Sequence, residues 1–145
     1  MIIFLNTFII IATALTFYFF NSRYFIIALI EVLLTILQLL SHAATALINP
    51  GMPTAKPITR ERLETIKNNR RLYCAICKIE IVPEKKIVHC EDCDVCVEGF
   101  DHHCPWTGKC IGRRNIIPFY IFLIVTGILI YYIIFASIFC LYCYS

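Results

Sequence analysis

Charged residues are scarce in this sequence and almost absent from its two ends. Only 16% of the 145 residues are Asp, Glu, Lys or Arg, whereas 59% are hydrophobic, compared with roughly half in ordinary globular proteins. Twelve of the thirteen Lys and Arg residues lie between Lys56 and Arg114, and Arg23 is the exception. This distribution excludes an ordinary soluble domain and is typical of a membrane protein with one soluble module. The net charge of +3 indicates no partner by itself, and we expect no nucleic-acid partner.

Three apolar runs, at residues 1–20, 24–48 and 118–143, are long enough to cross a membrane, because a spanning helix needs about 20 residues. Each run must be helical, since backbone amides in lipid have to be paired within the chain. The first run lacks the basic start and the cleavage site of a signal peptide. The predicted fold class is therefore an α-helical multi-pass membrane protein with three transmembrane helices.

The positions of the basic residues predict the orientation of these helices, because Lys and Arg stay on the cytoplasmic side. The segment between the second and third helices is expected in the cytosol, and residues 21–23 on the other side. Within the second helix, Glu31 and Gln38 share one face and are expected to point into the bundle, where they line a cavity or form interhelical hydrogen bonds. We expect an integral protein of endomembranes, in the Golgi or the ER.

Residues 49–72 are predicted to form a juxtamembrane linker with a short surface helix. Pro50 and Gly51 end the second transmembrane helix. Thr59 is in position to cap a helix over residues 60–69. Further along the chain, isoleucines on both sides of residues 83–86 predict a small hairpin between metal ligands.

Seven of the nine cysteines lie in the segment expected in the cytosol, where thiols stay reduced and indicate metal binding or catalysis rather than disulfides. With three histidines they make ten candidate ligands. Zinc takes four Cys or His ligands in structural sites, so two sites use eight and leave two. A module of about 40 residues with few large apolar groups also needs such metals for stability. The candidates are Cys74, Cys77, His89, Cys90, Cys93, Cys96, His102, His103, Cys104 and Cys110.

The two remaining residues decide what the module does, and their spacing alone does not identify them. If they are one Cys and one His, they form a nucleophile with its base. Within Asp101-His102-His103-Cys104, one His would then bind metal and the other would face Cys104, with Asp101 orienting the base. In the alternative, all four residues are structural, and Asp101 supports a ligand His.

This cysteine-rich segment resembles the DHHC family of protein S-acyltransferases (palmitoyltransferases). The resemblance covers residues 74–119. It rests on His89-Cys90-x2-Cys93-x2-Cys96-Val97, on Asp101-His102-His103-Cys104-Pro105-Trp106, and on Cys110-Ile111-Gly112-x2-Asn115-x3-Phe119.

The resemblance implies a role for each ligand candidate. Residues 73–117 would be the cytosolic two-zinc module, with Cys104 as the acyl-accepting nucleophile, His102 as its general base and Asp101 as the orienting acid. One zinc would be held by Cys74, Cys77, His89 and Cys96, and the second by Cys90, Cys93, His103 and Cys110.

The resemblance also implies the substrates. A long-chain fatty acyl-CoA would donate its acyl group, and cysteines near the membrane in cytosolic or membrane proteins would receive it. Lys109, Arg113 and Arg114 follow the nucleophile and are expected to bind either the phosphates of CoA or the anionic lipid surface of the bilayer. A catalytically impaired zinc scaffold, or a subunit of a larger acyltransferase, is the alternative function.

Three features depart from the family pattern. Eleven residues separate Cys77 from His89, where the family usually has nine. Lys109 stands where the family usually has Asn. The sequence has three apolar runs and no Thr-Thr-x-Glu motif after the last, whereas the family normally has four or more spans followed by that motif.

Overall fold

In the computed structural model, the chain forms two compact units. The helical unit comprises residues 1–45 and 118–145, and the hairpin unit comprises residues 46–117. The structure describes residues 2–19, 25–54, 58–69 and 71–144.

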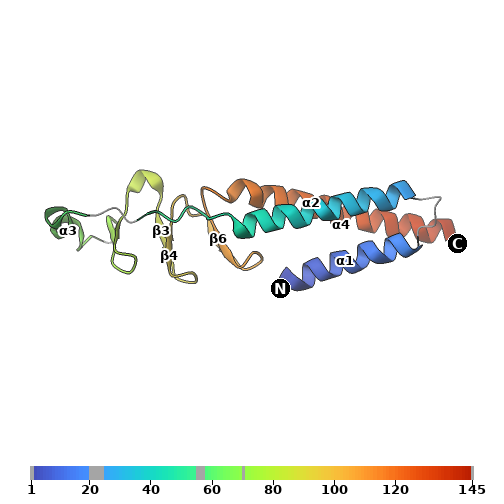
Figure 1. Ribbon diagram of the computed structural model, residues 1–145, viewed down its shortest axis with the longest axis horizontal. Helices are drawn as coiled ribbons and strands as arrows, with labels where there is room; N and C mark the ends of the chain where they lie inside the picture. Colours follow the sequence, from blue (N-terminus) through green and yellow to red (C-terminus); the bar gives the residue numbers. More distant parts are fainter. Residues whose placement is uncertain (1, 20–24, 55–57, 70, 145) are drawn as a thin grey trace. The chain divides into compact units, whose positions relative to one another are not determined.

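The helical unit is built from three apolar helices (Figure 1), α1 (Ile2–Phe19), α2 (Phe25–Leu47) and α4 (Ile116–Tyr144). Among the residues that the structure describes, two stretches are long and apolar enough to cross a membrane, namely Phe25–Leu47 and Ile116–Phe139. The corresponding apolar stretch of α1 is shorter, Asn6–Leu15. The prediction of spanning helices is therefore supported for α2 and α4, and the count of three stays a prediction.

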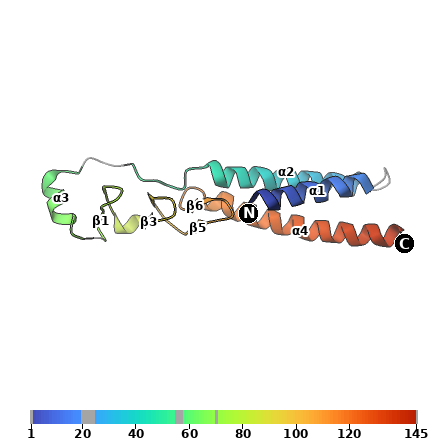
Figure 2. The ribbon, with the colours of Figure 1, turned by 90° about the horizontal axis from the view of Figure 1, so that it is seen from below.

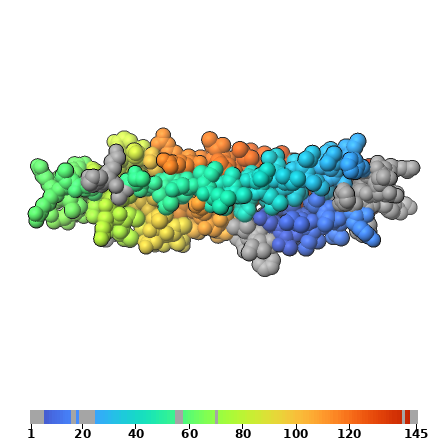
Figure 3. All heavy atoms as spheres, viewed as in Figure 1, coloured from blue at the N-terminus to red at the C-terminus, as the bar shows by residue number. Residues whose placement is uncertain are grey.

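Helix α2 carries a polar face that is buried within the helical unit. Both Glu31 and Gln38 are fully buried. The amide of Gln38 donates a hydrogen bond to Asn6 Oδ1 of α1 at 3.3 Å, so the interhelical hydrogen bond that was one of its two predicted roles is present. Other positions along α2, which runs across the space-filling view in Figure 3, expose leucine, isoleucine and phenylalanine side chains. Polar residues inside and apolar residues outside are what a lipid environment favours.

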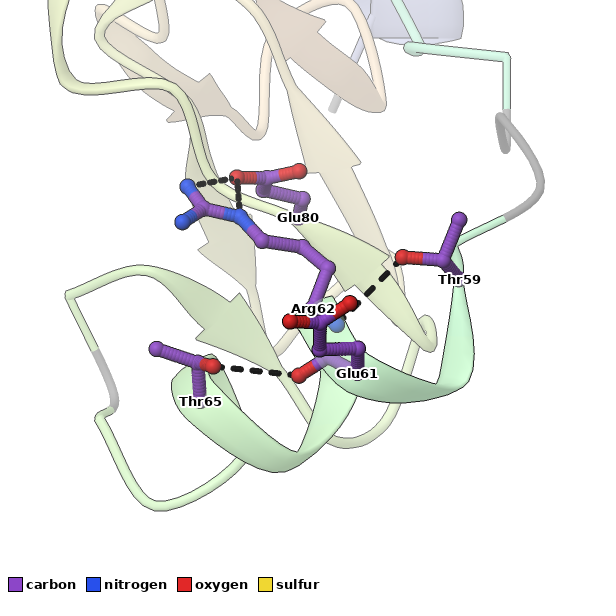
Figure 4. Close-up of polar contacts among 5 residues, drawn as sticks. All are labelled: Thr59, Glu61, Arg62, Thr65 and Glu80. Atoms are coloured by element: carbon purple, nitrogen blue, oxygen red, sulfur yellow. Dashed lines mark hydrogen bonds and ion pairs between the residues drawn. The ribbon is translucent and has the colours of Figure 1, made fainter.

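The hairpin unit begins with a short helix, α3 (Arg60–Ile66), that follows the linker. The hydroxyl of Thr59 caps it by accepting a hydrogen bond from the Arg62 amide at 3.3 Å, as predicted, although the helix ends earlier than residue 69. Figure 4 shows the guanidinium of Arg62 reaching from α3 to Glu80, where two of its nitrogens lie 3.0 and 2.6 Å from one carboxylate oxygen. This ion pair connects α3 to the first hairpin.

Three short antiparallel hairpins make up the rest of the hairpin unit (Figures 1 and 2). Each consists of two strands of two or three residues. The strands pair as β1 (Tyr73–Cys74) with β2 (Ile79–Glu80), β3 (Val88–Cys90) with β4 (Val95–Val97), and β5 (His102–Cys104) with β6 (Lys109–Ile111).

The predicted hairpin around residues 83–86 is wrong. Residues Pro83–Lys85 form a single 3-10 turn, η2, that connects the first hairpin to the second. Ile79 and Ile87 do not pair across it, and both side chains are buried in one cluster with Cys74 and Cys96. The chain turns instead within the Cys-x2-Cys segments that begin at Cys74 and Cys90. Each of these turns brings the two cysteines of its segment close together.

Close backbone contacts join the segment after α2 to the second and third hairpins. The Gly51 carbonyl accepts a hydrogen bond from Glu98 N at 2.9 Å, and the Pro50 carbonyl accepts one from Arg114 N at 3.3 Å. A Cβ atom on Gly112 would lie 2.6 Å from Pro50 O, which is far too close. Glycine at position 112 therefore permits the packing that holds the third hairpin in place.

Candidate metal centres and active site

Eight of the ten candidate ligands gather into two clusters of four, each with three thiols and one imidazole. Within a cluster, all donor atoms lie within 4.8 Å of one another. The clusters are Cys74, Cys77, His89 and Cys96, and Cys90, Cys93, His103 and Cys110, which are the two sets implied by the sequence resemblance.

The distances within the clusters fit tetrahedral zinc. Zinc–sulfur and zinc–nitrogen bonds of about 2.3 and 2.05 Å place two ligand atoms on a tetrahedron about 3.6 Å apart. In the first cluster, His89 Nδ1 lies 3.3 Å from the sulfur of Cys77 and 3.7 Å from that of Cys74. In the second cluster, His103 Nδ1 lies 3.3 Å from Cys93 Sγ and 3.8 Å from Cys90 Sγ.

Hairpin pairing explains how each cluster is assembled. One hairpin supplies both cysteines of its turn, and the next hairpin supplies a His and a Cys that face each other across the strands. His89 is opposite Cys96, and His103 is opposite Cys110. Consecutive residues of a strand point to opposite faces, so the neighbours His89 and Cys90 in β3 serve different clusters.

The electrostatics of the clusters also favour a cation. Burial, followed by the neighbouring thiols, raises the pKa of Cys96 and of Cys110. Clustered thiols of this kind resist losing their protons unless a positive ion lies between them, and a coordinating thiol is deprotonated outright. In addition, Asp94 Oδ1 lies 3.5 Å from His89 Nε2, as expected for a carboxylate that orients a ligand histidine.

Strand β5 separates the two adjacent histidines. Because side chains alternate along a strand, His102 and Cys104 share one face, and His103 points to the other. Accordingly His103 lies in the second cluster, while the imidazole of His102 hydrogen-bonds with the thiol of Cys104. The structure thus assigns His103 to a candidate metal cluster and leaves His102 beside the thiol of Cys104.

Asp101 completes this arrangement. Its carboxylate lies 2.8 Å from Nδ1 of His102, which leaves Nε2 as the nitrogen for the thiol. Desolvation lowers the pKa of His102, but the hydrogen bonds to Asp101 and Cys104 outweigh it, and the net pKa is raised. Both changes in the imidazole, its fixed tautomer and its higher basicity, suit a general base.

The sulfur of Cys104 is buried, since only 2% of the residue is exposed. Burial raises its pKa, whereas the hydrogen bond with His102 and the backbone N–H groups of Thr107 and Trp106 lower it, and the net pKa lies below the ordinary value. A thiolate is the reactive form of cysteine. Thr107 was not among the residues predicted for the site, although its spacing from Cys104 repeats that of the Cys-x2-Cys pairs.

The three basic residues expected to bind phosphate or lipid have different surroundings. The ammonium of Lys109 donates a hydrogen bond to Ala46 O, in the last turn of α2, at 2.8 Å. The guanidinium of Arg113 pairs with Glu98 at 2.7 Å and is largely exposed. Arg114 is exposed, and no carboxylate of the described residues pairs with its side chain. Arg114 is therefore the residue of the three for which the described part of the chain shows neither an ion pair nor a side-chain hydrogen bond.

Comparison with known proteins gives a consistent family assignment. The family model for the DHHC palmitoyltransferase matches residues 67–145, more than half of the chain. The chain is 34% identical to palmitoyltransferase ZDHHC9 of Homo sapiens and of Bos taurus, over 91% of its own length but only 44% and 45% of theirs. It is 46% identical to palmitoyltransferase ZDHHC18 of Homo sapiens, over 52% of this chain and 20% of that protein. The chain thus spans less than half the length of these relatives. It belongs to the DHHC palmitoyltransferase family.

Proposed function

We propose that this chain carries the catalytic site of a protein S-acyltransferase. It moves a long-chain acyl group, such as palmitoyl, from fatty acyl-CoA to cysteine thiols of membrane-associated proteins. The observation that carries this proposal is the pair left over by the metal clusters. Of ten candidate ligands, eight form the clusters, and the remaining two, His102 and Cys104, are hydrogen-bonded to each other and oriented by Asp101.

The reaction proceeds in two steps that share one intermediate. In the first, His102 removes the proton of the Cys104 thiol, and the thiolate attacks the carbonyl carbon of the acyl-CoA thioester. The bond between that carbon and the CoA sulfur breaks, CoA leaves as a thiol with the proton from His102, and an acyl thioester remains on Cys104. In the second step, a substrate cysteine attacks this thioester by the same chemistry. Such two-step covalent catalysis produces ping-pong kinetics.

The metal clusters contribute structure to this mechanism. Each provides four protein donors, which is the complete coordination of a structural zinc and leaves no position for substrate. Zinc would hold the three hairpins together and thereby fix β5, the strand that carries His102 and Cys104. The chemistry itself falls to the triad.

The chemistry of the donor explains why such a site belongs in a membrane protein. Moving a sixteen-carbon chain out of water is favourable by about 0.8 kcal/mol per CH₂. Only thirteen residues, 105–117, separate the nucleophile from the third apolar run, so the site cannot lie far from lipid. We propose that the hairpin unit faces the cytosol, where acyl-CoA is found, and that the protein resides in endomembranes. Arg114 would contact a CoA phosphate or an anionic lipid.

Acyl labelling of the purified full chain tests the proposal. In detergent, with a clickable palmitoyl-CoA, the protein is expected to acquire a label that hydroxylamine removes. Cys104→Ser should abolish the label, whereas Cys77→Ser, a metal ligand, should lose zinc as well. A zinc-loaded protein that acquires no label would contradict the enzyme and favour the alternative, a membrane-anchored zinc scaffold or a subunit that needs a partner.

A further inference from the structure

The three hairpins repeat one turn, and the nucleophile occupies the position of a metal ligand in the third copy. The first residue of the turn is Cys74, Cys90 or Cys104, the last residue of strands β1, β3 and β5. The residue four positions later has a positive φ in every case, of 54° at Lys78, 53° at Asp94 and 62° at Gly108. These matching backbone angles show that Cys104 starts the same tight turn that brings two thiols onto one metal in the first two hairpins.

The main-chain donors around the sulfur repeat as well. In the first hairpin, Cys77 N donates to Cys74 Sγ at 3.5 Å, and the amide of Ile76 also bonds this sulfur. In the third, the corresponding amides of Thr107 and Trp106 bond the sulfur of Cys104. Each sulfur thus receives N–H groups from the residues two and three positions ahead. The backbone N–H groups in a turn of this kind stabilise the thiolate of a metal ligand. The sulfur of Cys104 receives N–H groups from the equivalent positions.

The third turn differs from the other two in its fourth residue. Cys77 and Cys93 occupy this position in the metal turns, and Thr107 occupies it here. The threonine is buried, with 7% of its surface exposed, and its hydroxyl donates a hydrogen bond to the carbonyl of Cys104 at 3.3 Å. The side chain of Thr107 also lowers the pKa of the Cys104 thiol. In the metal turns, a shared ion would connect the first and fourth residues. In the third turn, the hydrogen bond of the Thr107 hydroxyl connects them.

We infer that Thr107 is a positioning residue for the acyl transfer, whose hydroxyl closes the nucleophile's turn in place of a second metal thiol and keeps the Cys104 sulfur directed at His102. This inference rests on the proposed function, because it assigns a role in that reaction. Without the hydroxyl, the amide of Thr107, 3.2 Å from Cys104 O, would retain the turn and the backbone contact with the sulfur, and only the contacts of the side chain would be lost. Removing the hydroxyl should therefore impair the reaction more than the fold.

Two substitutions in the full chain separate positioning from folding. Thr107→Val preserves the shape of the side chain and removes the hydroxyl, whereas Thr107→Ser keeps the hydroxyl. The matched control is Thr65→Val, which removes an exposed hydroxyl that donates to Glu61 O in α3 (Figure 4). Single-turnover acylation is measured against palmitoyl-CoA concentration, together with zinc content.

Thr107→Val is expected to lower the maximal acylation rate about tenfold, the effect of one lost hydrogen bond. The palmitoyl-CoA concentration at half-maximal rate and the two zinc ions per chain should stay unchanged. Thr107→Ser should recover most of the rate, and Thr65→Val should match the unmodified chain. An unchanged rate in Thr107→Val, a change confined to half-saturation, or a loss of zinc that Thr107→Ser does not restore would each overturn the inference.

Alkylation of Cys104 by chloroacetamide distinguishes this inference from the proposed function. If the unmodified chain takes no acyl group, the proposed function fails, but the alkylation rate still reports how the sulfur is held. A rate in Thr107→Val that is several-fold below that of the unmodified chain and of Thr107→Ser would support the positioning role. Equal rates in all three proteins would refute it.

Discussion

Replacing each of the two adjacent histidines by alanine should have opposite consequences, and this pair of variants is the sharpest test of the site. His102 lies on the face of β5 that carries Cys104, with its side chain 39% exposed and bonded to Asp101. His103 lies on the opposite face, with Nδ1 3.3 Å from the sulfur of Cys93. Two neighbouring residues of the same type are thus predicted to perform unrelated tasks.

His102→Ala removes the base and no metal ligand. General base catalysis is worth about 10²- to 10⁴-fold, so the rate of single-turnover acylation should fall by that factor, while zinc content stays at two per chain. His103→Ala leaves the second cluster with three donors, so zinc content should fall to about one. Structural zinc contributes about 10–16 kcal/mol of folding free energy in small domains, so the third hairpin should become sensitive to protease and the acylation should be lost with it.

The measurements are elemental analysis of zinc, limited trypsin digestion and acyl labelling on the same preparations. Loss of zinc from His102→Ala would show that this histidine is a ligand and would refute the division of the motif. Two zinc ions and full protease resistance in His103→Ala would refute it as well. If the His102→Ala variant binds two zinc ions and remains active, the assignment of the metal clusters would stand. His102 could then no longer be the general base of the mechanism.

Three further predictions follow from the same geometry. The pKa of the Cys104 thiol is lowered, and the reactive thiolate forms above that pKa. Alkylation of Cys104 should therefore begin at a lower pH than alkylation of an ordinary exposed thiol. In His102→Ala the midpoint of that pH profile should move upward, and an unmoved midpoint would contradict the hydrogen bond. Gly112→Ala should destabilise the protein by about 1–3 kcal/mol, because the added Cβ has no room. The control Gly127→Ala, with nothing within 4 Å of its added Cβ, should leave the midpoint temperature of thermal unfolding unchanged or slightly higher. Thr107→Cys should complete a third Cys-x2-Cys turn, so that added zinc inhibits acylation and a chelator restores it; indifference to zinc would show that the third turn does not resemble the other two.

The ligand sets could be predicted because they depend on counting and spacing. There are ten candidate ligands, and two zinc sites with four ligands each leave two of them over. The family resemblance then implied which two residues these are. Alternation along a strand explains the assignment physically, since it sends His89 and Cys90, and likewise His102 and His103, to opposite faces. The strands that impose this alternation have only three residues, too few for a periodic pattern to reveal them in the sequence.

The turns of the hairpin unit could not be predicted in the same way. Hairpin turns are usually recognised from Gly, Asn or Asp at positions that need a positive φ, and in the first hairpin that position is occupied by Lys78. The isoleucines around Pro83 then suggested a hairpin in the wrong place. Two thiols that converge on one ion would stabilise a turn that Lys78 itself disfavours, so we expect ligation, and not intrinsic turn preference, to decide the topology here.

The repeated turn also explains how a metal-binding module can hold a nucleophile without losing it to the metal. Backbone amides that stabilise a zinc-bound thiolate stabilise a free one equally well, so Cys104 gains a lowered pKa from a turn whose geometry the module already uses twice. A second thiol in that turn would convert the nucleophile into half of a metal site. Thr107 has the hydrogen-bonding capacity to close the turn and too little affinity for zinc to bind it. On this inference, the reactivity of Cys104 depends on the residue three positions after it as well as on the histidine two positions before it.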